Sequence, residues 1–433
     1  MRESQRRREE VAGGLGALVL VLLLCLVGLP VKGHYVSACG SNLFGELGNG
    51  SVGGTSVLLQ KIAAPLVMLD VQAISAGEDI SLFLVNGSVY GCGDNEGWCR
   101  ALGIASGPFY SYLTPPVLIP NLTQAVAISA GQDHALVMVH KPHAPNTAHK
   151  MPEQYVVMGF GTNRFGQLGS TPSSYAVAPP VVVPMPNISG VWPKAVAAGC
   201  KYSLVLLTNG TVYSFGKNDE GQLGLGPSNT PPMVVTPTLI PGLTNVVAIA
   251  AGGAHSLFLL ADGTVYACGR NDTGQLGLGS PGSPVLTPTL IQSLSNVTAI
   301  AAGLYHSLVL ECVAAAAAPK TARCGVLFSF GSNSYRQLGL GPNVTASIIS
   351  TPLPVPAPFT YGVTAISAGE RHSLVLRDGQ VFSCGANDCG QRGWGFGVVS
   401  DTFQLMMGFT SADIIQGSVT AISAGWVHSL VLY

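Results

Sequence analysis

The chain has 433 residues, of which 47% are hydrophobic and only 9% are charged, and its formal net charge is −1. Without residues 1–33, 15 basic residues stand against 18 acidic ones, so the charge balance gives no basis for binding nucleic acid. The high hydrophobic and low charged content is not that of a disordered protein, and the 55 Gly and 29 Pro are typical of many short strands joined by tight turns.

Residues 1–33 have the features of a secretory signal peptide. Three arginines at positions 6–8 precede an uncharged run from Val11 to Val31, and small residues lead to a cleavage point before His34. The run is also long enough to span a bilayer, so an uncleaved signal anchor is the alternative. In both cases we expect residues 34–433 to lie on the lumenal or extracellular side, secreted or anchored, and at a membrane only if the segment stays uncleaved.

Two motifs alternate along the rest of the chain. The first, GxNxxGQLG, starts at Gly161, Gly216 and Gly269, with looser copies at positions 40, 331 and 385 and a distorted copy at position 93. The second, AISAGxxHSLVL, is centred on seven glycines spaced 51 to 68 residues apart, at positions 77, 131, 199, 252, 303, 369 and 425. This spacing fits a four-stranded propeller blade. The sequence therefore predicts an all-β, seven-bladed β-propeller over residues 34–433.

One repeat illustrates the strands that we expect in each blade. From Val246 the order is a strand of small residues, a turn, the strand HSLFLLA, an Asp-Gly turn, the strand TVYACG, the GxNxxGQLG loop and a Pro-flanked strand near VLTPTLI. Runs of Ala, Ser and Gly suit the innermost strand because blades converge on the propeller axis.

The two ends of the chain are predicted to complete one blade. The chain stops after the second strand of a unit and begins with residues that match a third strand. We therefore expect residues 35–39, and a strand near Leu66 to Leu69, to pair with the segment from Val419 to Tyr433, which would close the ring and hide two strand edges.

The paired motifs resemble the repeats of the regulator-of-chromosome-condensation family over nearly the whole mature chain, from about Tyr35 to Tyr433. The resemblance implies the propeller fold. It also implies two functions, because the family's propeller is known both as a guanine nucleotide exchange factor for the small GTPase Ran and as a general interaction module. Since the leader places this chain across a membrane from nuclear Ran, exchange activity is the alternative interpretation.

Eight Asn-X-Ser/Thr sequons are present, whereas the composition predicts about two or three by chance. This excess favours a lumenal glycoprotein. Asn271 occupies the motif's own structural position, where its side chain should cap a turn, so we expect it to stay unmodified. The other seven are candidate glycosylation sites: Asn49, Asn86, Asn121, Asn187, Asn209, Asn296 and Asn343.

Five histidines share one repeat position: His134, His255, His306, His372 and His428. They would stand in five different blades, so we expect structural roles, with each imidazole bonding a local backbone group, rather than catalysis. The insertion containing His140, His143 and His149 has no Cys or acidic partner and does not predict a metal site. No catalytic motif stands out, so we expect neither enzymatic activity nor a cofactor.

Four cysteines occupy a repeat position that is Phe elsewhere, which predicts small buried apolar side chains: Cys39, Cys92, Cys268 and Cys384. In an oxidising lumen three close pairs are candidate disulfides. Cys312 and Cys324 flank an insertion between two strands that must pair, which favours this bond. The other two pairs, Cys92 with Cys99 and Cys384 with Cys389, would require the GxNxxG loop to fold back.

The two most distorted GxNxxG loops carry Trp98 with Arg100 and Arg392 with Trp394. Equivalent propeller loops emerge on one face, so these side chains could form a patch that anchors a protein partner, unless each Trp packs over its own loop. We therefore predict a monomeric lumenal or extracellular scaffold that binds a protein or a cell-surface glycan. The alternative is a guanine nucleotide exchange factor or related regulator of a small GTPase.

Overall fold

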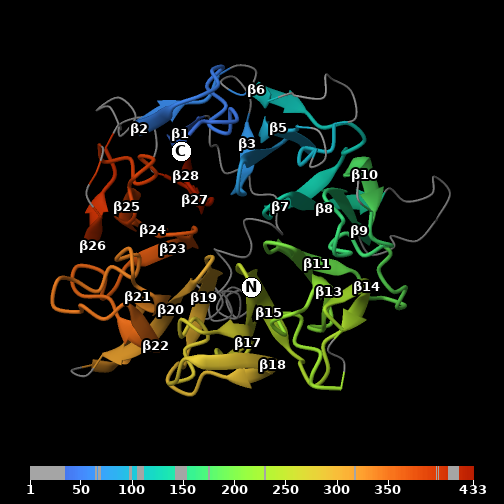
Figure 1. The fold of residues 1–433 in the computed structure, drawn as a ribbon. Helices are drawn as coiled ribbons and strands as arrows, with labels where there is room; N and C mark the ends of the chain where they lie inside the picture. Colours follow the sequence, from blue (N-terminus) through green and yellow to red (C-terminus); the bar gives the residue numbers. More distant parts are fainter. Residues whose placement is uncertain are drawn as a thin grey trace, which may run out of the picture.

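The computed structural model describes residues 35–433 except 64–65, 67–69, 97–99, 105–111, 142–153, 174–175, 229–230, 316–317, 396, 398 and 408–418. The described residues form seven four-stranded antiparallel sheets arranged as blades around one axis (Figure 1). The predicted seven-bladed propeller is therefore confirmed. The leader lies outside the described residues. Within them, no helix is long and apolar enough to cross a membrane.

Blade 1 contains both ends of the described chain, and the other blades follow in chain order. Blade 1 is β2 (Thr55–Lys61), β1 (Val36–Ser41), β28 (His428–Leu432) and β27 (Ala421–Ala424). Blade 2 is β3 (Val71–Ala76), β4 (Ile80–Val85), β5 (Ser88–Asp94) and β6 (Tyr112–Leu118), and blade 3 is β7 (Ala125–Ala130), β8 (His134–Lys141), β9 (Gln154–Gly161) and β10 (Val177–Val182). Blade 4 is β11 (Pro193–Ala198), β12 (Tyr202–Leu207), β13 (Val212–Lys217) and β14 (Met233–Leu239).

The last three blades have the same order. Blade 5 is β15 (Val246–Ala251), β16 (His255–Leu260), β17 (Val265–Asn271) and β18 (Gly282–Leu290). Blade 6 is β19 (Val297–Ala302), β20 (His306–Ala315), β21 (Ala318–Ser332) and β22 (Ile348–Pro354). Blade 7 is β23 (Val363–Ala368), β24 (His372–Arg377), β25 (Gln380–Gly385) and β26 (Ser400–Leu405).

Small residues line the axis, as the sequence predicts. The innermost strand of each blade ends in Ala and is followed by Gly, and these residues surround a central cavity of about 90 Å³. A Cβ atom added to Gly77 would lie 2.5 Å from the carbonyl oxygen of Gly131 in the next blade. The blades therefore approach more closely at the axis than any larger side chain permits.

The N-terminal strand closes the ring. β1 pairs with β28, with Val36 opposite Leu432 and Cys39 opposite Ser429, and Figure 1 shows the blue first strand beside the red last strand. The outer strand of this blade is β2, at Thr55–Lys61, and not the predicted strand near Leu66 to Leu69, of which residues 67–69 lie outside the described residues. Leu66 lies after β2, in the connection to blade 2, and is buried there, which explains its hydrophobic character.

The histidine that recurs in five blades forms a side-chain contact with the neighbouring blade. It does not bond the local backbone as we expected. His306 Nε2 of blade 6 lies 2.8 Å from Ser373 Oγ of blade 7, and Ser373 Oγ donates to the carbonyl oxygen of Gln337, in the blade 6 loop. Because the serine hydrogen is used on that carbonyl, the imidazole Nε2–H donates to the serine. The same contact joins His134 to Ser203, His255 to Ser307, His372 to Ser429 and His428 to Ser81.

The asparagine of the GxNxxGQLG motif stabilises a turn within the loop that contacts the next blade. Asn163 Oδ1 accepts from the backbone N–H of Leu168 at 2.9 Å, which is the predicted turn cap. Asn271 does the same for Leu276, its side chain also donates to the Ser280 carbonyl, and the residue is only 4% exposed. This burial agrees with our expectation that the Asn271 sequon stays unmodified.

The four repeat-position cysteines are fully buried, and burial raises the pKa of each thiol far above its usual range. Two of the predicted disulfides were wrong, since Cys92, Cys384 and Cys389 are free and Cys99 lies outside the described residues. The Cys92 and Cys384 thiols point into the interface with the preceding blade, where they donate to the carbonyl oxygens of Glu46 and Gln337. A disulfide joins Cys312 to Cys324 across the β20–β21 hairpin.

Candidate functional site

One face of the propeller carries both repeated motifs. In blade 5, β15 ends at Ala251 and β16 begins at His255, and His255 pairs with Gly269 near the end of β17. The turn after β15 and the GxNxxGQLG loop after β17 therefore lie on the same face, which we call the mouth face. The hairpin turns between second and third strands, such as Asp262–Gly263, lie on the opposite face, which we call the hairpin face.

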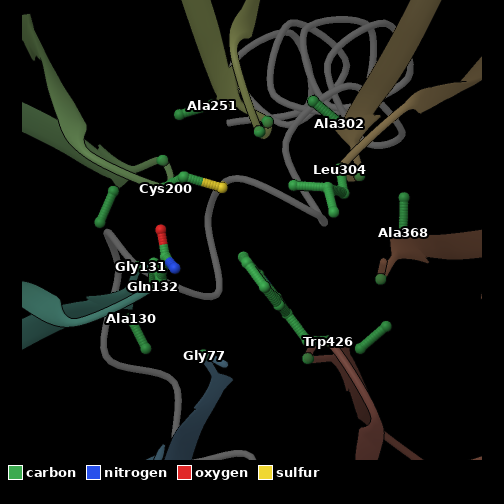
Figure 2. Close-up of a pocket in the computed structure, with 18 of the residues that line it drawn as sticks. Gly77, Ala130, Gly131, Gln132, Cys200, Ala251, Ala302, Leu304, Ala368 and Trp426 are labelled. Atoms are coloured by element: carbon green, nitrogen blue, oxygen red, sulfur yellow. The ribbon is translucent and has the colours of Figure 1, made fainter. Parts of the chain in front are cut away.

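A ring of variable side chains surrounds the axis on the mouth face. The residue after the motif glycine differs in every blade apart from a repeated Glu, whereas the Ala-Gly pair before it is the same in every blade. Figure 2 shows the side chains of Gln132, Cys200, Leu304 and Trp426 pointing toward the axis. We call this set the axial ring: Glu78, Gln132, Cys200, Gly253, Leu304, Glu370 and Trp426.

Acidic side chains of blades 2 and 3 lie on one side of the mouth face. We call them the acidic arc: Glu78, Asp79, Asp94 and Asp133. Burial is the main cause that raises the pKa of all four carboxyl groups, to about 7 for Glu78 and about 8 for Asp79. Glu78 and Asp94 also raise the pKa of Asp79 by repulsion. Within the described part of the chain, no basic side chain lies at ion-pair distance from these four groups.

Basic side chains of blades 4 and 5 lie on another side of the mouth face. We call them the basic arc: Lys201, Lys217 and Arg270. The two lysine Nζ atoms lie 5.5 and 5.7 Å from the ring centre of Phe165, and the Arg270 guanidinium lies 5.5 Å from that of Tyr305. The three basic side chains line a cavity of about 300 Å³ that extends inward to the axial ring. The mouth therefore has separate regions of negative and positive charge.

The predicted partner-binding residues do not form one patch. Arg392 was predicted wrongly, because it is 1% exposed and its guanidinium donates to Gln404 Oε1 at 2.7 Å inside blade 7. Trp394 is 41% exposed, and the N–H of the following Gly395 bonds to Val57 on the outer part of blade 1. Arg100 is half-buried in the loop that packs on blade 3, and Trp98 lies outside the described residues.

Sequence reasoning missed the axial ring, above all Trp426. A signal was available, since Trp426 stands at the first of the two positions of the AISAGxxHSLVL motif that change from blade to blade. Bulky or charged side chains at that position break a pattern of small residues. Variation at a fixed repeat position, rather than distortion of a loop, was the informative feature.

Six of the seven candidate sequons have exposed Asn side chains, and Asn49 is half-buried, with its side chain bonded to Gln60 and Ser51. The described residues contain no group of three or more His, Cys, Asp or Glu that could hold a metal ion. His143 and His149 lie outside the described residues.

Comparison with known families agrees with the repeats and the ring. The RCC1-like domain matches residues 33–309, and regulator of chromosome condensation (RCC1) repeats match residues 325–376 and 363–391. The chain belongs to the regulator of chromosome condensation family. Its members share the propeller, which is consistent with the fold described above.

Two solved structures have the same architecture. Human WBSCR16 has a TM-score of 0.72 at 22% identity, covering 92% of this chain and 99% of that one. Yeast RCC1 (Prp20), solved with Kap60, has a TM-score of 0.73 at 20% identity, covering 92% and 88%. At this identity the likeness shows the fold alone.

Curated relatives have diverse roles. The chain is 32% identical to the probable E3 ubiquitin-protein ligase HERC6 of Homo sapiens over 70% of its own length but 27% of the ligase. It is 27% identical to the ultraviolet-B receptor UVR8 of Arabidopsis thaliana, covering 83% and 74%. The chain thus spans about a quarter of the ligase, and the two relatives share the propeller rather than one activity.

Proposed function

We propose that this propeller is a protein-binding scaffold of the secretory pathway and that its partner docks on the mouth face. One observation carries the proposal. The side chains that join the blades repeat around the ring, whereas the axial ring changes in nearly every blade. Rigid repeated blades that present variable residues at one face are the arrangement by which propellers carry specificity.

The charges of the mouth favour a protein over a glycan as the partner. The acidic and basic arcs stand on different blades, so a surface with complementary charges would be both attracted and oriented. Trp426 supplies a large half-buried aromatic side chain, and in blade order it stands between Glu370 and Glu78 of the axial ring. Aromatic side chains near the centre of an interface are frequent energetic anchors.

The secretory location rests on the leader and on the exposed sequons. In cells, the mature chain should lack residues 1–33 or carry them as an anchor, and its mass should fall on deglycosylation. A chain found in the cytosol or nucleus with an intact leader and no glycan would refute this part. That result would favour the alternative of a guanine nucleotide exchange factor, which a nucleotide-release assay with small GTPases would then test.

Co-precipitation tests the mouth face directly. We would compare proteins retained from the secretory lumen and medium by the parent chain, by Trp426→Ala and by Trp192→Ala. Trp192 is a matched control because it is also half-buried but lies on the hairpin face, where its backbone pairs with Thr208. We expect a partner that the parent and Trp192→Ala retain and that Trp426→Ala loses. Equal retention by all three would refute the proposed binding face.

A further inference from the structure

We infer that the cavity beneath the basic arc is a subsite for a single carboxylate that is followed by an apolar or aromatic group, as in an acidic side chain of a bound peptide. This inference rests on the proposed function, since it names the chemistry that the mouth face recognises. It depends on the cavity, on how its basic side chains are held and paired, and on the character of its inner wall.

The cavity has the size and position of a subsite. It measures about 300 Å³ and lies between the GxNxxGQLG loops of blades 4 and 5 and the axial ring. Its basic and aromatic outer wall comes from three successive blades, with Lys201 and Lys217 from blade 4, Arg270 from blade 5 and Tyr305 from blade 6. A space of this volume takes one or two side chains of a partner rather than a whole structural element.

Aromatic rings hold the basic side chains in place. Phe165, which comes from the loop of blade 3, lies against both lysine ammonium groups, and Tyr305 lies against the guanidinium of Arg270. A cation over an aromatic face is attracted by the ring and loses freedom before any ligand arrives. The entropy cost of ordering these side chains on binding is correspondingly smaller.

The remaining charge matches a monoanion. Lys217 Nζ lies 2.7 Å from Asp219, and Arg270 Nε donates to Asp272 at 2.8 Å. These two acidic side chains neutralise two of the three basic groups, whereas Lys201 makes no ion pair within 4 Å in the described structure and interacts with Asp133 only at longer range. Glu370 also lines the cavity but is paired with Arg371 at 2.9 Å, so it repels an anion weakly, and the repulsion grows with the charge of the anion. A carboxylate is therefore favoured over a phosphate monoester, which carries nearly two charges at neutral pH.

The inner wall has an apolar stretch beside the polar side chains of Gln132 and Glu370. Leu304 and the indole of Trp426 point toward the axis beside Cys200, as Figure 2 shows. Burial raises the pKa of the Cys200 thiol to about 12, so this side chain is a neutral apolar contact and not a nucleophile. A ligand that reaches from the basic arc to this wall must carry its charge at one end and an apolar group next to it.

The experiment uses the unmodified chain and two small peptides. N-acetyl-Glu-Phe-amide carries one carboxylate beside an aromatic ring, and N-acetyl-Gln-Phe-amide is its neutral match. Saturation-transfer NMR would measure the dissociation constant of each peptide, with inorganic phosphate as a competitor. We expect the Glu peptide to bind at least about tenfold more tightly than the Gln peptide, the size of one charge-assisted hydrogen bond, and phosphate to compete poorly.

Two variants locate the binding. Lys201→Gln should weaken binding of the Glu peptide by about tenfold and leave binding of the Gln peptide unchanged. Lys194→Gln is the matched control, since Lys194 lies at the other end of blade 4, near the hairpin face, and should have no effect. Equal affinity for the two peptides, tighter binding of phosphate, or an unchanged constant in Lys201→Gln would each overturn the subsite. If these fail while partner retention still depends on Trp426, the subsite is refuted and the mouth face is not.

Discussion

The contact between His306 and Ser373 should behave as a coupled pair that joins blade 6 to blade 7. Both side chains are fully buried, and the serine links the imidazole of one blade to the loop carbonyl of Gln337. The same two repeat positions in other blades also suggest that the histidine and the serine act as a pair. Blade 2 has Ile80 at the histidine position, and blade 3, which packs against it, has Ala135 at the serine position. Where apolar Ile80 replaces the imidazole, the hydroxyl is absent as well, whereas the polar Tyr202 of blade 4 keeps Ser256 of blade 5 as a partner at 3.1 Å.

Ser373→Ala should lower stability by about 1 to 3 kcal/mol, because the Nε2–H of His306 loses its acceptor while remaining buried. The Gln337 carbonyl keeps the Cys384 thiol as a partner and adds little to this cost. At about 2.1 cal/mol/K per residue, a ring of about 400 residues unfolds with an entropy of about 0.8 kcal/mol/K. The melting temperature should therefore fall by about 1 to 4 °C.

Differential scanning calorimetry on a double-mutant cycle would measure the coupling. Replacing both partners by apolar residues removes the unpaired donor, so His306→Ile with Ser373→Ala should be less destabilised than the two single changes added together. Ser383→Ala is the matched control, since Ser383 is buried in the same blade and donates only to the Arg392 carbonyl. Additive effects in the first pair, or equal coupling with Ser383→Ala, would refute the reasoning.

The remaining predictions concern pH, covalent structure and ring closure. Burial lowers the pKa of His306 to about 3 in the folded state, below its ordinary value of about 6.5, so its contribution to stability should be complete above pH 6.5 and should fall as the pH drops. Because Glu78 and Asp79 change stability in the opposite direction over the same range, the test uses the Glu78→Gln, Asp79→Asn variant, and a melting temperature of that variant that is unchanged between pH 7 and 5 would contradict this. Burial raises the pKa of Glu78 and Asp79 to about 7 and 8, so the contribution of these carboxyl groups to folding stability is lost as the pH rises through those values. The double variant Glu78→Gln, Asp79→Asn should therefore melt at a higher temperature than the parent at pH 9 but not at pH 5. Non-reducing peptide mapping should recover Cys312 linked to Cys324 and free thiols at Cys384 and Cys389; a link between the last two would show that the blade 7 loop folds differently. Deleting residues 35–39 should destabilise the whole ring because β28 loses its partner strand. A loss of stability no larger than that caused by shortening the 314–318 insertion would contradict closure of the ring by β1.

The sequence predicted the fold well because its repeats encode the geometry of a blade directly. Small residues before each motif glycine, the turn-capping Asn163 and the terminal strand next to Val36 all have local causes that can be seen in the sequence. The outer strand of blade 1 was misplaced because buried hydrophobic residues such as Leu66 also occur in connections, where a short apolar run does not distinguish a strand from a packed loop.

The site was less predictable because it depends on contacts between blades. Arg392 looked like a surface residue because charged side chains are seldom fully buried, but its partner Gln404 is supplied by the next strand of the same blade. Cys384 and Cys389 are close in sequence, yet the first thiol turns to the carbonyl of Gln337 in another blade. Trp426 acquires its position only when seven turns meet at one axis, which no single repeat can reveal.

Hydrogen–deuterium exchange on the partner complex tests the central claim most directly. The turns of the mouth face, from residue 77 to 79 in blade 2 through 425 to 427 in blade 1, should exchange more slowly in the complex than in the free chain. The hairpin turns on the opposite face, at Asn209 and Asp262, should exchange at the same rate in both. Protection confined to the hairpin turns, with unchanged exchange at the mouth, would contradict a binding site at the axial ring.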